Sequence, residues 1–200
     1  MMSLTFDRYL AQVLPETPEA DKGLNVGCGH DVWPGWVNTD VADLPGVDVV
    51  CALGEDKLPF ADGHFDVIVA RDVLEHVDLI PALAELHRVL SPGGRLIVST
   101  VHFTSRNLWI DPTHRRGFSL RTLDMFVAGG KRSYYFDFAF SAVEDVTLQM
   151  NDGDGPGRWL LWHRLAEPVI NRSRLIQDVY EATFLARLFP GGNVLAVLRR

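Results

Sequence analysis

The stretch GLNVGCG at residues 23–29 decides the fold of this chain. Gly23–Val26 predicts a short strand, and the glycines that follow predict a tight turn at its end. Because glycine carries no Cβ, the backbone N–H groups of such a turn can approach an anionic ligand closely. A dinucleotide-binding loop would need a further glycine where Val32 stands, and no Gly-Lys-Ser/Thr phosphate loop is present. The motif therefore indicates either a ligand-binding turn or a purely structural one.

A carboxylate follows this turn at the end of the next predicted strand. Asp40 lies eleven residues after Gly29 and directly after the strand predicted at Trp36–Thr39. A carboxylate in this place can accept hydrogen bonds from both hydroxyls of a ribose. A helix N-cap or a solvated turn is the alternative for Asp40.

The next segments predict a parallel sheet. Val47–Cys51 and Asp66–Ala70 are compact β-branched runs, typical of interior strands covered on both faces. Leu79–Leu90 has apolar residues at helical spacing and runs through a Ser-Pro-Gly-Gly stop into a strand at Arg95–Val101. Strand, helix and strand of these lengths predict a right-handed crossover, so ligands are expected at the carboxyl ends of the strands.

The flanking segments complete the predicted domain. Phe6–Val13 and Ser119–Ala128 predict helices, and residues 146–150 alternate as in a strand. Apolar positions from Ile176 to Leu188 predict one helical face. The last strand, Asn193–Leu198, follows a short turn and is expected to run antiparallel.

Composition fits one ordinary α/β domain, which we expect to span residues 1–200. The chain is 47% hydrophobic and 22% charged, with a net charge of −7, which disfavours nucleic acid as a partner. No apolar run approaches the ~20 residues of a membrane span, and Asp7 and Arg8 fall where a signal peptide would be apolar. Cys28 and Cys51 form no disulfide framework. We therefore expect a cytoplasmic protein without membrane contact.

Four motifs in this order give the chain a family resemblance. They are LNVGCG at 24–29, LPF at 58–60 with FDVI at 65–68, VLEH at 73–76 and RVLSPGG at 88–94. With them the chain resembles class I S-adenosylmethionine-dependent methyltransferases of the type 11 group. The resemblance implies a Rossmann-like α/β fold: a mostly parallel seven-stranded sheet with an antiparallel last strand and helices on both faces.

The resemblance also implies how S-adenosylmethionine is bound. The glycine turn would border its methionine part, Asp40 would hold its ribose, the segment 53–55 would flank its adenine, and residues 70–72 would close the site. The cofactor-binding residues expected in this way are Val26, Gly27, Cys28, Gly29, Asp40, Val41, Leu53, Gly54, Glu55, Arg71 and Asp72.

Two departures from the family pattern concern this site. The segment 29–40 has room for a turn but not for the usual first helix, and Pro34–Gly35 breaks what remains. Arg71 is then a candidate for pairing with the methionine carboxylate, with a plain surface arginine as the alternative. Ala52 stands near where many relatives have an acidic residue, which leaves Glu55, Asp56 or backbone carbonyls for the adenine amino group.

The chemistry expected is an in-line displacement, in which a hydroxyl acceptor also needs a base. His114 and His102 follow the fifth predicted strand and are the candidate bases, with Asp111 to orient His114. Packing is the alternative for both histidines, and His76 is taken as structural by resemblance. The Asn-Pro-Pro-Tyr signature of amino-directed relatives is absent, since Arg71–Asp72 stands in its place.

Mg²⁺ is left open as a second cofactor. Asp72, His102 and Asp111 offer suitable donor types, but their spacing across a loop assigns no metal site.

The function predicted is O-methylation of a small-molecule, sugar or glycan acceptor, with polysaccharide biosynthesis of the methylmannose type as one setting. Candidate sugar-stacking residues are Trp33, Trp36, Trp109, Trp159 and Trp162. A non-catalytic cofactor-binding protein or inactive partner subunit is the alternative, and an RNA methyltransferase is less favoured because the basic surface it needs is missing from the composition. The oligomeric state stays open, with a homodimer among the alternatives.

Overall fold

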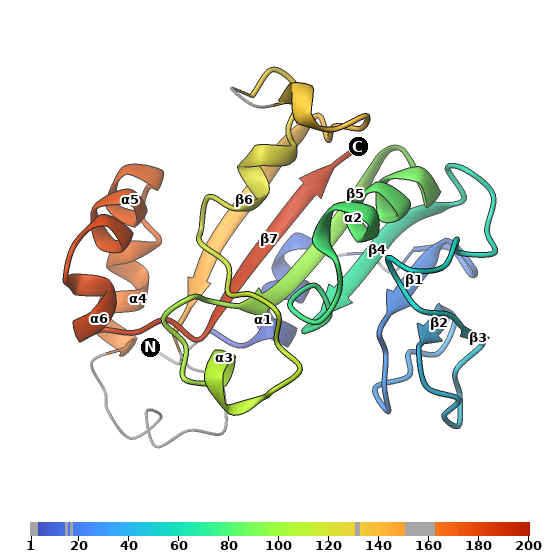
Figure 1. The fold of residues 1–200 in the computed structure, drawn as a ribbon, viewed down its shortest axis with the longest axis horizontal. Helices are drawn as coiled ribbons and strands as arrows, with labels where there is room; N and C mark the ends of the chain where they lie inside the picture. Colours follow the sequence, from blue (N-terminus) through green and yellow to red (C-terminus); the bar gives the residue numbers. More distant parts are fainter. Residues whose placement is uncertain (1–3, 15, 17, 131–132, 151–162) are drawn as a thin grey trace.

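A computed structural model describes residues 4–14, 16, 18–130, 133–150 and 163–200. Their centre is a seven-stranded sheet in the order β3-β2-β1-β4-β5-β7-β6 (Figure 1). The strands are β1 Gly23–Val26, β2 Val37–Asp40, β3 Val49–Val50, β4 Phe65–Arg71, β5 Leu90–Val101, β6 Ala142–Gln149 and β7 Asn193–Arg199. The helices are α1 Phe6–Val13, α2 Leu79–Val89, α3 Asn107–Ile110, α4 His163–Ile170, α5 Arg174–Ala182 and α6 Leu185–Leu188, with 3₁₀ segments at Leu123–Phe126 and Ser133–Tyr135.

Strand directions confirm the predicted sheet. The five strands from β3 to β5 pair in parallel. The last strand, β7, is inserted between β5 and β6 and runs antiparallel to both. The carboxyl ends of β1, β2 and β4 therefore meet at one edge of the sheet, where a ligand is expected.

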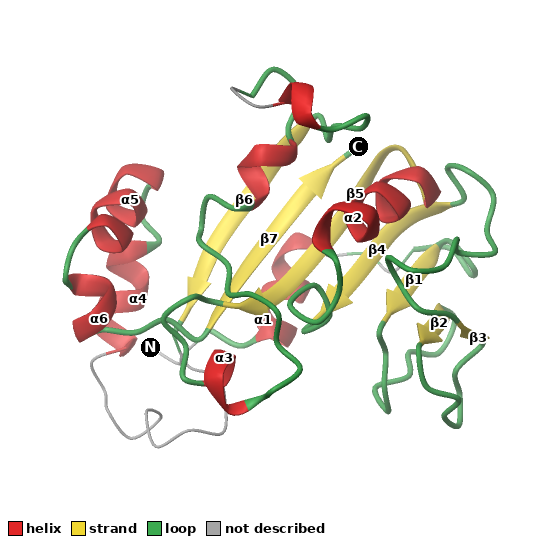
Figure 2. Cartoon of the chain, in the orientation of Figure 1, coloured by secondary structure: helices red, strands yellow, loops and turns green. Residues whose placement is uncertain are grey.

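Helices cover both faces, as predicted (Figure 2). On one face α2 packs Leu83 and Leu86 against strand residues such as Ile68 of β4. On the other face α1 packs Phe6 and Tyr9 into a smaller cluster with β4, β5 and β7. The alternation of side chains along a strand explains the two clusters, since neighbouring residues of β4 point to opposite faces.

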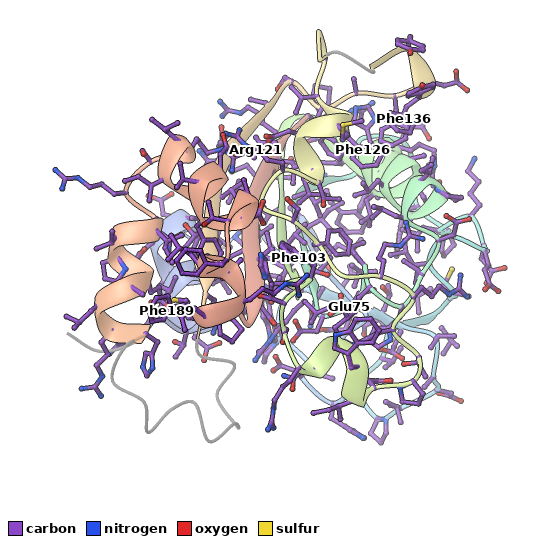
Figure 3. The ribbon with its side chains drawn as sticks, turned by 60° about the vertical axis from the view of Figure 1, so that its left-hand side comes forward. Glu75, Phe103, Arg121, Phe126, Phe136 and Phe189 are labelled. Carbon is purple, nitrogen blue, oxygen red and sulfur yellow. The ribbon has the colours of Figure 1, made fainter. Side chains whose placement is uncertain are left out.

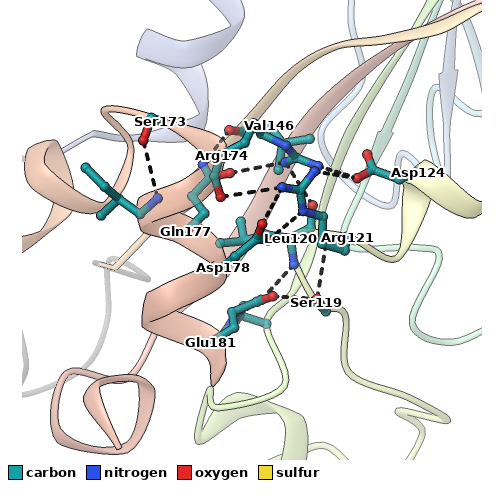
Figure 4. A network of polar contacts seen from close by, with 12 residues as sticks. Ser119, Leu120, Arg121, Asp124, Val146, Ser173, Arg174, Gln177, Asp178 and Glu181 are labelled. Atoms are coloured by element: carbon teal, nitrogen blue, oxygen red, sulfur yellow. Dashed lines mark hydrogen bonds and ion pairs between the residues drawn. The ribbon is translucent and has the colours of Figure 1, made fainter. Parts of the chain in front are cut away.

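A polar network ties α5 to the loop after residue 118 (Figure 4). Arg121 donates from Nε and Nη2 to Asp178, each at 2.7 Å. Arg174 donates to Asp124 at 2.5 Å and to the Leu120 carbonyl at 3.0 Å. Bidentate arginine pairs of this kind fix orientation as well as charge, so α5 is held in register with the loop.

Side chains also cover the outer edge of β6. Asn171 accepts from the Leu148 backbone N–H and donates to the Leu148 carbonyl, both at 2.8 Å. Gln177 donates to the Val146 carbonyl at 2.9 Å. Backbone groups that another strand would pair with are thereby satisfied from the α4–α5 region.

Three local predictions were wrong. Val47–Cys51 is not an interior strand: β3 has two residues and lies at the edge of the sheet, with Val50 exposed. The helix predicted at Ser119–Ala128 is reduced to the 3₁₀ segment Leu123–Phe126, whose buried apolar residues recur every three positions and so match the 3₁₀ period.

The long helix predicted over Ile176–Leu188 is interrupted. α5 ends at Ala182, Thr183 takes an extended conformation, and α6 starts again at Leu185. Phe184 is 71% exposed, so the predicted apolar face is not continuous. Trp159 and Trp162 lie outside the described residues.

Candidate active site

The glycine turn directly follows β1 and lies beside the carboxyl end of β2. Gly27 and Gly29 have φ of +65° and +53°, a region that favours glycine. A Cβ on Gly27 would lie 2.2 Å from the Val73 side chain, so this position admits only glycine, whereas a Cβ on Gly29 would meet no atom within 4 Å. The turn therefore combines close packing beneath Gly27 with open space at Gly29.

Asp40 holds this turn in place. Its Oδ2 accepts a hydrogen bond from the Gly29 N–H at 2.8 Å, and its Oδ1 accepts from the Ala42 N–H at 2.9 Å. Each carboxylate oxygen has a second lone-pair site, so the side chain can still accept from a ligand hydroxyl. The expected ribose contact is thus compatible with a positioning contact that the sequence did not reveal.

A cavity of about 190 Å³ opens above the ends of these strands. It brings together six of the predicted cofactor residues with three residues of the loop after β4 and one of the loop after β3. The lining residues are Val26, Gly27, Asp40, Val41, Cys51, Leu53, Asp72, Val73, His76 and Val77. Predicted residues that do not line it include Gly54 and Glu55, which lie on the turn after Leu53.

A second cavity of about 660 Å³ shares Gly27 and Asp72 with the first. Arg71 lines it together with Cys28 and residues of α1. The Arg71 guanidinium lies 3.3 Å from Asp31 and stacks over the Phe6 ring with 5.1 Å to its centroid. Arg71 therefore lines the cavity beside the glycine turn, and its pairing with an anionic ligand group stays a prediction.

The segment between β1 and β2 contains no helix. Two buried asparagines hold it instead: Asn25 donates to the Asp31 carbonyl at 2.8 Å, and Asn38 accepts from the Trp33 N–H at 2.9 Å. Asn25 also donates to Asn38 at 3.0 Å, which links the two strands. The predicted shortening of the first helix is confirmed, and sequence reasoning missed the asparagine pair that replaces it.

Asp72 closes the edge between the two cavities. It has φ of +54°, and its carboxylate accepts from Ser99 Oγ at 3.0 Å and from Asn193 Nδ2 at 2.9 Å. These contacts fix the side chain to β5 and β7.

Glu75, His76 and His114 form a cluster, and His76 of this cluster lines the smaller cavity. One donor atom from each lies within 4.8 Å of the others, and the two imidazole rings have centroids 4.6 Å apart. Glu75 is 1% exposed and accepts from Thr100 Oγ1 at 2.8 Å. Burial raises the pKa of Glu75 to about 7, despite hydrogen bonds that favour its charged form.

Sequence reasoning missed two members of this cluster. His76 was taken as structural and Glu75 was not singled out, although the Glu-His pair follows β4 at the edge where ligands bind. The backbone N–H of Arg115 donates to the Glu75 carbonyl at 2.8 Å, which brings the His114 loop against the loop after β4.

Asp111 acts on this cluster through Thr113. Its Oδ1 accepts from the Thr113 backbone and hydroxyl at 2.8 and 2.6 Å, and the hydrogen bonds from Thr113 hold the pKa of Asp111 below its ordinary value. The Thr113 hydroxyl in turn contacts Nδ1 of His76 at 2.9 Å. Asp111 thus orients His76 rather than His114, whose buried Nδ1 has no hydrogen-bond partner among the described residues.

His102 lies elsewhere in the structure. It is fully buried, with Nε2 3.0 Å from Glu181 Oε1 and Nδ1 2.7 Å from Thr104 Oγ1. Both ring nitrogens are engaged, so we do not retain His102 as a base. The donor set Asp72, His102 and Asp111 is also not brought together, because each side chain has separate partners.

Among the described residues there is no helix with the length and apolar character needed to cross a bilayer.

Comparisons with known proteins agree with this fold. The family model of the methyltransferase domain matches residues 21–98, which contain the glycine turn, Asp40 and Glu75. The S-adenosylmethionine-dependent methyltransferase of Archaeoglobus fulgidus superposes with a TM-score of 0.60 at 17% identity, covering 96% of this chain and 91% of that one, and so shares its fold. Residues 21–98 thus match a methyltransferase domain, and the described residues share the fold of class I S-adenosylmethionine-dependent methyltransferases.

Curated relatives match shorter segments of the chain. It is 47% identical over 60 residues to a ubiquinone/menaquinone biosynthesis C-methyltransferase of Psychromonas ingrahamii, across 30% of this chain and 24% of that protein. It is 34% identical over 76 residues to a malonyl-[acyl-carrier protein] O-methyltransferase of Hahella chejuensis, across 37% and 27%. The chain therefore spans about a quarter of the length of these relatives.

S-adenosylmethionine is the cofactor of the family, and the residues of this methyltransferase-family site fit it. The open space at Gly29, the remaining acceptor capacity of Asp40 and the apolar wall at Leu53 match a molecule with a charged, a hydroxylated and an aromatic part.

Proposed function

We propose that this protein is an S-adenosylmethionine-dependent methyltransferase that methylates a hydroxyl group of a small molecule, sugar or glycan. The observation that carries the proposal is one continuous cavity wall, running from the Asp40 carboxylate through Gly27 to the His76 ring, with His114 against that ring. A cofactor site and a candidate proton acceptor thus lie at the same opening.

The two cavities would hold different parts of the cofactor. Asp40 would accept hydrogen bonds from the ribose, Leu53 and Val77 would contact the adenine, and Arg71 would pair with the methionine carboxylate. Bound S-adenosylmethionine supplies an electrophilic methyl carbon on a positively charged sulfur. The protein's part is to align an acceptor oxygen with that carbon.

His114 is the proposed proton acceptor for the hydroxyl. Its ring centroid lies 4.6 Å from that of His76, which lines the cavity, and an imidazole suits a base near neutral pH. Asp111 and Thr113 hold the neighbouring His76, so the pair of rings has a fixed support.

An exposed aromatic side chain supports a sugar or glycan acceptor. Trp109 on α3 is 81% exposed and precedes Asp111 and His114 in the same loop. An indole face stacks well on a sugar ring. Polysaccharide biosynthesis of the methylmannose type remains part of this proposal, and the relative that methylates an oxygen supports the reaction class.

A non-catalytic cofactor-binding protein is the second candidate. The observation that favours it is the absent helix between β1 and β2, since a helix N-terminus would normally stabilise the anionic end of a ligand there. The relative that methylates carbon offers a different acceptor within the same reaction class. The net charge of −7 does not favour RNA.

The test is a screen of hydroxyl acceptors with methyl-labelled cofactor, together with calorimetry of cofactor binding. We expect a labelled product with the native chain, and a loss of about 1–3 kcal/mol of cofactor binding free energy for Asp40→Ala, because stranded polar partners cost that much. Glu19→Ala, an exposed carboxylate away from both cavities, is the matched control. Tight binding without turnover on any acceptor would favour the non-catalytic alternative, and unchanged affinity in folded Asp40→Ala would contradict the site.

A single domain and a cytoplasmic location belong to the same proposal. All seven strands of the described residues form one sheet, and Cys28 and Cys51 are both free, which suits a reducing compartment.

A further inference from the structure

We propose that Glu75, His76 and His114 bind a divalent transition-metal ion of the zinc class at the rim of the cofactor cavity. Their donor atoms lie within 4.8 Å of one another, a separation that small side-chain rotations close around one ion. The three come from two segments, the loop after β4 and the loop after α3, which the Arg115–Glu75 backbone hydrogen bond holds together. The site is therefore assembled by the fold rather than by sequence spacing.

The free donor atoms point to a ligand. The buried Nδ1 of His114 has no hydrogen-bond partner among the described residues, which is costly for a shielded polar atom unless something binds it. His76 uses Nδ1 on Thr113, so its Nε2 remains to coordinate. Histidine ligands of metals commonly fix their second nitrogen in this way.

A second layer of contacts supports the three side chains. Thr100 donates to Glu75 Oε2 at 2.8 Å, and Asp111 holds the Thr113 hydroxyl that contacts His76. Such outer contacts orient metal ligands and are costly to lose. Glu75 is 1% exposed, and a carboxylate buried to this degree gains most from a cationic partner.

The donor set selects the class of ion. Two imidazoles and one carboxylate suit Zn²⁺ and its neighbours, whereas Mg²⁺ prefers oxygen ligands and retained water. Three protein ligands also leave a fourth position of a tetrahedral ion open. The candidate site differs in its residues and in its ion from the Asp72, His102 and Asp111 set considered from the sequence.

The open position suggests what the ion does, and this step rests on the proposed function. An acceptor hydroxyl that binds there would lose its proton to water more readily, since a bound divalent ion lowers the pKa of a coordinated oxygen. The alkoxide oxygen would then form a bond to the methyl carbon while the carbon–sulfur bond breaks and its electron pair goes to sulfur. His114 would in that case act as a ligand and not as a free base.

Calorimetry of metal binding tests the site without any methyl transfer. Tag-free, chelator-treated full chain is titrated with ZnCl₂ and, separately, with MgCl₂, alongside His114→Ala, His76→Ala and the control His64→Ala. His64 directly precedes β4 and so lies at the amino ends of the parallel strands, whereas the cluster follows their carboxyl ends. We expect one zinc ion per chain, a loss of affinity of at least ~100-fold in each cluster variant, and no change for His64→Ala.

Unchanged zinc affinity in folded His114→Ala, or tighter binding of Mg²⁺ than of Zn²⁺, would overturn the assignment. Cofactor binding measured on the same samples separates the two proposals. Zinc binding that depends on the cluster supports this site even if no acceptor is ever methylated. Conversely, methyl transfer that survives complete loss of the cluster's zinc affinity would remove its catalytic role.

Discussion

Two glutamate–histidine clusters contact the carboxyl end of β5 and differ in how fully their polar atoms are used. In the first, Glu181 accepts from His102 at 3.0 Å, from the Leu120 N–H at 2.7 Å and from Ser119 Oγ at 2.6 Å. In the second, Glu75 and His76 meet His114, which keeps a buried nitrogen without a partner among the described residues. Figure 3 shows Glu75 well apart from Arg121, whose network lies beside the first cluster.

The pKa values of the two carboxyl groups are shifted in opposite directions. Burial pushes the pKa of Glu181 upward, but hydrogen bonds from His102, Ser119 and Leu120 outweigh it and hold the pKa below its ordinary value. Around Glu75 burial prevails and raises the pKa to about 7. The first cluster thus has its polar atoms paired, whereas the second combines a carboxyl group of raised pKa with a buried His114 nitrogen that has no partner among the described residues.

The largest effect is expected for His114→Ala, which tests whether the second cluster takes part in methyl transfer. We expect turnover to fall by something like ~10²–10⁴-fold with cofactor affinity nearly unchanged, since proton transfer contributes on that scale and His114 does not line either cavity. The measurement is initial rate with labelled cofactor, with His64→Ala as control. Full activity in the variant would make the second cluster structural like the first.

Removing Glu181 should expose the structural role of the first cluster. Glu181→Ala strands His102, Ser119 and the Leu120 N–H, so we expect the free energy of unfolding to fall by about 2–4 kcal/mol at pH 7. A carboxyl whose folded pKa is lowered contributes stability above its unfolded pKa, near 4.3, and loses it as the pH falls through the folded value. The deficit should therefore shrink in acid.

Denaturant unfolding between pH 7 and pH 3 measures this deficit. Glu19→Ala, at an exposed carboxylate, supplies the baseline. A deficit that stays constant across this range would show that Glu181 stabilises by packing and not by charge.

The smallest effect is expected at the surface of the same network. Asp178→Ala removes the bidentate pair with Arg121, but these side chains are 47% and 41% exposed. Exposed pairs are screened by solvent, so the loss of unfolding free energy should be at most about 1 kcal/mol and should decrease with added salt. A larger, salt-independent loss would show that this pair stabilises the fold as a buried ion pair does.

The sheet and the cofactor edge could be predicted because their determinants are local. A glycine turn, Asp40 at a strand end and the α2 periodicity each act within a few residues, and the structure places them as expected. The strand predicted at residues 47–51 was wrongly placed in the interior of the sheet. An apolar run of this length does not reveal whether a further strand pairs beside it.

The candidate chemistry was only partly predictable because it depends on contacts between distant segments. His114 was found as a loop histidine, but its neighbours Glu75 and His76 lie 39 and 38 residues earlier in the chain. The burial of His102 by Glu181 likewise joins positions 79 residues apart, and nothing in the spacing shows that both ring nitrogens are engaged.

Asn171 caps the edge of the sheet at β6 with a side chain instead of a strand. Its amide presents an acceptor and a donor to Leu148 as an eighth strand would, yet it carries no backbone to pair onward. A copy of the protein that approaches β6 therefore finds the hydrogen-bonding positions at Val146 and Leu148 already taken, and edge-to-edge stacking of sheets cannot propagate from this side. The side-chain amides of Asn171 and Gln177 thus protect this part of the β6 edge from pairing with another strand.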